Sequence, residues 1–141
     1  MYLLGIFFFL ILVFQMLHKR GKAIMVSKDY YSSLESVIFE GEVKSKKIIE
    51  GNTGIIRLDL ISSNIDFYDV RDSQEIYAFV LKDKKCELLT SDMNKIEFND
   101  KIVFKESMVF LYRNNELVYQ WKIIIPNHTN FFRKARKYHK L

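Results

Sequence analysis

The apolar run at the start of the chain is the feature that most constrains it. From Tyr2 to Leu17 no charged residue occurs, and only Gly5 and Gln15 interrupt the hydrophobic sequence. The residues that follow carry three full positive charges, on Lys19, Arg20 and Lys22. A hydrophobic block closed by a basic cluster is typical of a membrane anchor. Residues 1–22 are therefore predicted to form an N-terminal transmembrane helix and its basic flank.

Two other interpretations fit this run less well. A cleaved signal peptide has positive charge before its apolar stretch and small residues after it, which is the reverse of this order. A soluble core helix shows polar positions at helical spacing, and this run is apolar all round. The run covers roughly 24 Å as a helix, against ~30 Å of hydrocarbon. Lys19 and Arg20 can shorten that difference by extending toward the lipid headgroups.

The basic flank also predicts the orientation. Positive residues stay on the cytoplasmic side of a membrane, and here they lie C-terminal to the span. We expect a single-pass protein of the cell membrane, with the remainder of the chain in the cytoplasm. An extracytoplasmic location remains open, because a few basic residues before Tyr2 would reverse the orientation.

The distribution of charge and the cysteine content argue against several classes of protein. The net charge is +5, yet residues 23–132 hold 14 basic and 17 acidic residues, so the basic excess lies at the two ends. A folded nucleic-acid-binding domain usually carries its excess within the fold. Cys86 is the single cysteine, which excludes a disulfide-stapled scaffold and four-cysteine zinc sites.

Beyond the anchor, the hydrophobic period predicts a β domain. Residues 23–36 have apolar positions at helical intervals and are expected to form a helical stalk. From Val37 onward apolar and polar residues alternate in short runs with turn signals every 8–12 residues, until Pro126 ends the pattern. The prediction is an all-β domain over 37–126, a small barrel or sandwich of six to seven antiparallel strands, of OB or SH3-like size.

Individual residues refine this prediction. Gly41 lies inside a predicted strand, where it suits a bulge or bend. Asn114 and Asn115 tolerate positive φ and suit a type I′ hairpin. The run Ile76–Leu81 is apolar on both faces, as a central strand is.

Three segments resemble a group of small, membrane-anchored bacterial proteins of unknown function. They are Phe39-Glu40-Gly41-Glu42-Val43, the Ile96–Ile102 run and Tyr112-Arg113-Asn114-Asn115. The resemblance implies a short all-β domain on a membrane or lipid anchor, over about Val37 to Ile123. It implies no catalytic residues.

The sequence shows no constellation typical of an enzyme, and no cofactor, metal or small-molecule ligand is predicted. Asp66, Asp69 and Asp72 recur at every third residue, but a calcium loop needs more oxygen ligands and usually a glycine. An acidic surface connection, with Arg71 neutralising a neighbouring aspartate, is the simpler interpretation. Cys86 is expected to be buried in a strand. The histidines, His18, His128 and His139, have no metal-ligand spacing.

The C-terminal residues 127–141 are predicted to form a basic tail. Phe131 and Phe132 precede five cations, and basic residues next to an anionic leaflet contribute on the order of 1 kcal/mol each. We expect this tail and the first basic cluster to contact the membrane surface. The predicted contact residues are Lys19, Arg20, Lys22, Phe131, Phe132, Arg133, Lys134, Arg136, Lys137 and Lys140. A solvated tail and RNA binding by the tail are the alternatives.

The resulting hypothesis is a single-pass membrane protein with a β domain that serves as a binding or assembly module. Its expected partner is the lipid bilayer, with another membrane protein as a further option. The alternative is an OB-like nucleic-acid-binding domain tethered to the membrane, with a stacking surface that includes Tyr119 and Trp121. A shared sheet face with structural packing is the simpler interpretation of these two rings.

Overall fold

A computed structural model of the chain describes residues 9–16, 30–73, 77–123 and 129–141, and the side chains of all of these except Thr129 and Asn130. The chain forms two compact units, Met1–Leu34 and Glu35–Leu141. In the first unit, residues 9–16 and 30–34 are helical. No helix within the described ranges is long and apolar enough to cross a membrane. The other residues of the predicted span, and Lys19, Arg20 and Lys22, lie outside the described residues.

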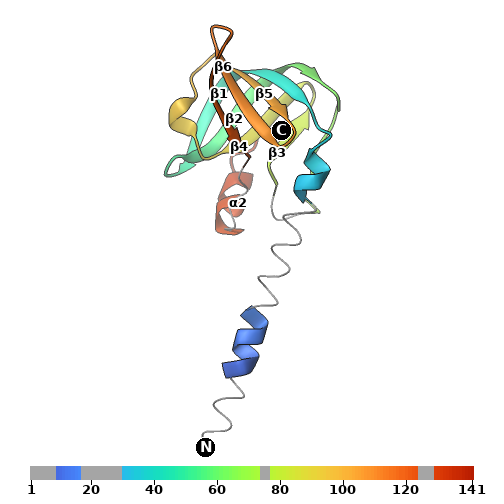
Figure 1. Cartoon of the computed structure of the whole chain (residues 1–141), viewed down its shortest axis with the longest axis vertical. Coiled ribbons are helices and arrows are strands. Elements are labelled where there is room, and N and C mark those ends of the chain that lie inside the picture. Colours follow the sequence, from blue (N-terminus) through green and yellow to red (C-terminus); the bar gives the residue numbers. More distant parts are fainter. Residues whose placement is uncertain (1–8, 17–29, 74–76, 124–128) are drawn as a thin grey trace, which may run out of the picture. The chain divides into compact units, whose positions relative to one another are not determined.

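The described residues of the second unit form seven strands, all paired antiparallel, in the order β3-β4-β2-β1-β5-β6-β7 (Figure 1). The all-β prediction and the number of strands are therefore confirmed. The strands are β1 (Phe39–Glu50), β2 (Thr53–Ser63), β3 (Phe79–Lys82), β4 (Lys85–Thr90), β5 (Lys101–Lys105), β6 (Met108–Arg113) and β7 (Glu116–Lys122), with a 3-10 turn, η1 (Met93–Lys95), and a C-terminal helix, α2 (Thr129–Arg136).

The prediction of a closed barrel or a two-sheet sandwich is wrong, because the seven strands form one open sheet. β3 and β7 end the strand order, and among the described residues they are not paired with each other. The sheet curls strongly instead (Figure 1). Phe39 of β1 contacts Phe79 of β3 and Phe104 of β5, with ring centroids 5.1 and 5.0 Å apart, and the rings of Phe79 and Phe104 lie 5.3 Å apart. Curling lets one face bury a core without closing the hydrogen-bond ladder.

Strand β3 is apolar on both faces, as predicted for the Ile76–Leu81 run, but it is an edge strand rather than a central one. Phe79 and Leu81 point into the curl of the sheet, while Val80 faces the other way. The outer side chain is buried because α2 packs against it. The edge itself is covered by Tyr68, whose N–H and C=O both bond to Leu81 at 2.8 Å. β3 is therefore buried on both faces because α2 covers its outer face, and not because it has a neighbouring strand on each side.

Several local predictions are confirmed. The register of β1 against β2 shifts between Glu40 and Gly41, so Gly41 stands at an irregularity of the expected kind. Asn114 and Asn115 have φ of 52° and 66°, as a type I′ hairpin requires. The β3–β4 turn uses the same backbone conformation with Asp83 and Lys84, at φ of 52° and 58°. The short polar side chains of Asn114, Asn115 and Asp83 tolerate this left-handed conformation. Lys84 adopts it because the two-residue hairpin turn requires it.

The C-terminal helix belongs to the same compact unit as the sheet. Phe131, Phe132 and Ala135 are buried, and their cluster is completed from the sheet side by Ile55, Tyr77, Val80 and Leu89. The outer face of β2, β3 and β4 is therefore the floor of a second core, with α2 as its cover. Phe131 and Phe132 were expected at the membrane surface, and the structure instead places both rings in this core, 5% and 1% exposed.

Candidate functional site

The polar side chains on the outer face of β2 and β4 form the most organised cluster in the described chain. The two strands are in register, with Arg57 opposite Glu87 and Asp59 opposite Lys85. Because side chains alternate along a strand, these four residues share a face with Ile55 and Leu89 under α2. The apolar end of this face carries the helix. The polar end is crossed by residues 138–141.

Glu87 is the centre of the cluster and is only 1% exposed. Its Oε1 accepts a hydrogen bond from Arg57 Nε at 2.6 Å, a direct cross-strand ion pair. The main-chain N–H of Lys140 lies 3.0 and 3.2 Å from Oε1 and Oε2. Arg57 also donates from Nη2 to the main-chain oxygen of Tyr138 at 2.5 Å. The pair on the sheet therefore holds the C-terminal segment at two main-chain positions.

His139 completes the cluster, and its side chain is 1% exposed. Its Nδ1 is in hydrogen-bond contact with Glu87 Oε2, and its Nε2 lies 2.7 Å from the Tyr77 hydroxyl. An imidazole between a carboxylate and a hydroxyl can hold a proton on either nitrogen. The hydroxyl on Nε2 belongs to Tyr77, whose side chain is fully buried and therefore not open to a substrate. The arrangement fastens the C-terminal segment to the sheet.

The charges of this cluster are fixed by its contacts. Burial favours the neutral acid of Glu87, but hydrogen bonds from His139, Arg57 and the Lys140 N–H outweigh it and lower the pKa of Glu87 from 4.5 to about 2. Burial raises the pKa of the Tyr77 hydroxyl well above its usual range, so this group stays neutral. Burial likewise raises the pKa of the Cys86 thiol. The carboxylate is therefore an anion and the hydroxyl a neutral partner at physiological pH.

A pocket of about 220 Å³ adjoins this cluster. Four cationic residues line it, and each comes from a different segment: Lys44 of β1, Arg57 of β2, Lys85 of β4 and Lys140 of the C-terminal segment. The other lining residues are Ser45, Leu58, Asp59, Cys86, Glu87 and Leu141. Lys140 and Leu141 of the C-terminal segment complete the lining that strands β1, β2 and β4 provide.

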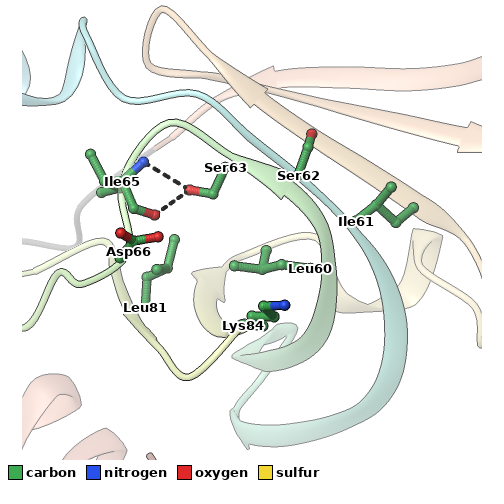
Figure 2. Close-up of a pocket in the computed structure, with 8 residues that line it drawn as sticks. All are labelled: Leu60, Ile61, Ser62, Ser63, Ile65, Asp66, Leu81 and Lys84. Atoms are coloured by element: carbon green, nitrogen blue, oxygen red, sulfur yellow. Dashed lines mark hydrogen bonds between the residues drawn. The ribbon is translucent and has the colours of Figure 1, made fainter.

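A second pocket, of about 370 Å³, lies at the end of β2 and is shown in Figure 2. Leu60 and Leu81 face each other across it, with Asp66 beside Leu81 and Lys84 beside Leu60. Ser63 and Ile65 are joined by two hydrogen bonds at its rim. Its charged lining is one carboxylate and one ammonium, so the charges balance.

The predicted stacking surface forms a contact cluster on β7. The rings of Tyr119 and Trp121 stack with centroids 5.4 Å apart, and Lys95 Nζ lies 3.3 Å from the Tyr119 centroid. Trp121 is only 8% exposed. A cation over one ring and a buried neighbour beside it leave little aromatic surface for a nucleotide base to stack on.

The acidic segment 66–72 is divided by the fold. Arg71 binds Asp69 through two hydrogen bonds of 2.8 and 2.6 Å, which confirms local neutralisation. This contact lowers the pKa of Asp69. Asp66 instead lines the pocket of Figure 2. Within the described ranges no group of three or more histidine, cysteine, aspartate or glutamate side chains is placed to hold a metal ion.

The predicted membrane-contact cations of the C-terminal segment are exposed: Arg133, Lys134, Arg136, Lys137 and Lys140. Among the contacts of these residues, Arg136 Nη2 donates to the Arg71 main-chain oxygen at 2.7 Å, and Lys134 Nζ lies 3.5 Å from Glu50. Cys86 is buried in β4, as predicted. His18 and His128 lie outside the described residues.

Sequence reasoning did not connect Glu87 and Tyr77 with His139, because His139 is more than 50 residues from both and none of the three lies in a motif. Comparison with protein-family models, with curated proteins and with solved structures finds no match to this chain. The resemblance to small membrane-anchored bacterial proteins stays a prediction.

Proposed function

We propose that this chain is a single-pass membrane-anchored binding module whose β domain presents the basic face of α2 to an anionic lipid surface. The apolar sequence of residues 1–17 and its basic flank support the anchor. The exposed cations of α2 support the second contact. A domain already held at the membrane needs little further affinity to keep such a contact, because the anchor raises its effective concentration.

The division of α2 into two faces carries this proposal. Phe131, Phe132 and Ala135 are buried against the sheet, while Arg133, Lys134, Arg136 and Lys137 are exposed. The aromatic residues therefore fix the helix, and the helix holds the cations on one folded surface rather than on a frayed tail. Lys134 faces Glu50 at 3.5 Å, but both side chains are more than half exposed, so this pair is weak. Cations near an anionic leaflet contribute on the order of 1 kcal/mol each.

This proposal differs from the sequence-based hypothesis in the role of the aromatic pair. The hypothesis had Phe131 and Phe132 insert at the lipid interface. In the proposed function they stay in the core and the contact is electrostatic. A contact of that kind weakens as salt rises, because exposed charges are screened over about 10 Å at 0.1 M ionic strength.

Three experiments test the proposal. Carbonate extraction of cells expressing the full chain should leave it in the membrane pellet, and recovery in the soluble fraction would contradict the anchor. A reporter fused after Leu141 should locate the β domain in the cytoplasm. For the second contact, the full chain carrying a fluorophore at K137C is placed in lipid nanodiscs that contain a headgroup quencher. Quenching should be stronger with anionic than with zwitterionic lipid and should fall as salt is added.

The matched variants remove equal charge from two places. R133Q/K134Q should lose the quenching, whereas K101Q/K105Q, which removes two cations from β5, should keep it. Equal quenching in anionic and zwitterionic discs, or equal loss in the two variants, would rule out a specific basic face. Salt-dependent retention of an oligonucleotide without any lipid effect would instead support the nucleic-acid alternative.

A further inference from the structure

We infer that the pocket between β1, β2, β4 and the C-terminal segment is a binding site for a phosphoryl group. This goes beyond the proposed function, because the pocket is distinct from the basic face of α2 and can bind a free phosphate compound or a lipid headgroup. The shared ligand chemistry is a small, multiply charged oxyanion. Lysine and arginine side chains recognise such groups by charge-assisted hydrogen bonds.

The first observation is the convergence of four cations. Lys44, Arg57, Lys85 and Lys140 are between 13 and 55 residues apart in neighbouring pairs along the chain, yet all four line one pocket of about 220 Å³. Typical drug-sized ligands occupy roughly 300–1,000 Å³. The smaller volume suits a phosphate or a pyrophosphate.

The second observation is the place of Lys44 in its strand. In the register of β1 with β2, Val43 pairs with Leu58 and Ser45 pairs with Arg57, so Lys44 is the extra residue of a bulge. Bulges redirect a side chain out of the regular alternation and are common beside functional sites. Here the bulge brings Lys44 to the pocket that Arg57 and Asp59 of the partner strand also line. Lys44 retains an exposed contact with Glu42.

The third observation is the charge that remains unbalanced. Two carboxylates, Asp59 and Glu87, line the pocket against four cations. Glu87 is fully engaged by Arg57, His139 and the Lys140 N–H. Among the described residues, Lys85 and Lys140 have no carboxylate within ion-pair distance. The main-chain oxygen of Leu141 is bound outside this set, by Arg71 at 2.9 Å. Lys44 is paired with Glu42 and Arg57 with Glu87, so Lys85 and Lys140 are the two cations left to bind a phosphoryl group.

Pyrophosphate is the probe for the first measurement. The full chain, in a non-ionic detergent, is dialysed to equilibrium against radiolabelled pyrophosphate at low ionic strength. We expect one saturable site on the wild-type protein and at least tenfold weaker binding in K85Q/K140Q. The control K82Q/K84Q removes two exposed lysines from the same hairpin and outside this pocket, and should bind as the wild type does. Thermal unfolding of each variant verifies that it is folded.

Three results would overturn the inference. They are no saturable binding to the wild type, equal loss in K85Q/K140Q and K82Q/K84Q, and unchanged binding in K85Q/K140Q. R133Q/K134Q separates this site from the proposed function, since it should lose the nanodisc contact and keep pyrophosphate binding. Competition between pyrophosphate and lipid nanodiscs identifies the source of the ligand. Displacement of pyrophosphate by nanodiscs of phosphatidate, but not of phosphatidylglycerol, identifies a phosphomonoester headgroup. Binding that neither lipid displaces identifies a soluble phosphate compound.

Discussion

The carboxylate of Glu87 and the imidazole of His139 are hydrogen bonded although 52 residues separate them, and both side chains are 1% exposed. One residue belongs to a strand and the other to the segment that follows α2. Their contact closes the polar end of the outer face just as Phe131 and Phe132 close its apolar end. The C-terminal segment is therefore attached by a core and by an ion-pair cluster at once.

Replacement of Glu87 by glutamine should destabilise the β domain by about 2–4 kcal/mol at neutral pH. Removing one member of a buried ion pair leaves the other uncompensated, and Arg57 is only 21% exposed. Chemical denaturation followed by tryptophan fluorescence measures the change. Glu42→Gln is the control, because Glu42 contacts Lys44 in an exposed pair and its loss should cost less than about 1 kcal/mol. Equal costs in the two variants would contradict the central role of Glu87.

The free energy of unfolding of the β domain should depend on pH through Glu87. The pKa of Glu87 is about 2 in the folded protein, below its ordinary 4.5, so folding favours the ionised form. This contribution, about 3 kcal/mol, is fully present above pH 4.5 and is lost as the pH falls toward 2. Asp69 and Asp100 also have lowered pKa values and act in the same direction. The difference between the wild type and E87Q isolates Glu87, and that difference should shrink on acidification. A constant difference between pH 7 and pH 3 would contradict the assignment.

Tyr77→Phe should cost about 1–3 kcal/mol, although the ring and its packing remain. The substitution leaves His139 Nε2 buried without its hydroxyl partner, and an unsatisfied buried polar group carries its full desolvation cost. Thermal unfolding provides the comparison. Tyr119→Phe serves as the control, since the ring contacts of Tyr119 with Lys95 and Trp121 do not use its hydroxyl. A neutral Y77F would show that the hydrogen bond to His139 adds nothing to stability.

Phe132→Ala should cost about 3–5 kcal/mol, because the side chain is 1% exposed and packs against Tyr77 with ring centroids 5.5 Å apart. Arg133→Ala, at the adjacent exposed position, should change stability by less than about 0.5 kcal/mol. Urea denaturation of both variants gives the two values. If F132A were as stable as the wild type, the C-terminal residues would behave as a tail and not as part of the fold.

Gly54→Ala should destabilise the β1–β2 hairpin by about 3 kcal/mol. A Cβ at this position would lie 2.1 Å from the main-chain oxygen of Lys47, so the backbone must move. Gly51→Asn is the matched control. Gly51 has φ of 55° with no atom within 4 Å of an added Cβ, and asparagine tolerates that backbone conformation. Circular dichroism during thermal unfolding should rank G54A well below G51N, and the reverse order would contradict the register of this hairpin.

The strands and turns were predictable because their causes are local. Alternation of apolar side chains predicts a strand from a few neighbouring residues, and the positive φ of Asn114 and Asn115 follows from their own chemistry. The burial of Cys86 followed from its position in a strand. None of these predictions required knowledge of residues distant in the chain.

The rest depended on contacts over long sequence separations. Phe131 and Phe132 beside five cations have the composition of a membrane-binding tail. They become core residues because the apolar side chains of Ile55, Val80 and Leu89 lie on the outer face of the sheet and pack against them. The same packing makes β3 an edge strand that is buried on both faces. The sheet curls without closing into a barrel. That curl depends on how Phe39, Phe79 and Phe104 pack together.

Because α2 covers the outer face of the sheet and follows the strands in the chain, the two cores form one after the other during synthesis. All seven strands are made before residues 129–141, so the inner core can form while Ile55, Val80 and Leu89 still face water. An exposed apolar surface on a nascent chain is a site for chaperones and for aggregation. A chain truncated before Phe131 would keep all seven strands and lack the cover of this face. Such a chain is expected to aggregate through that face.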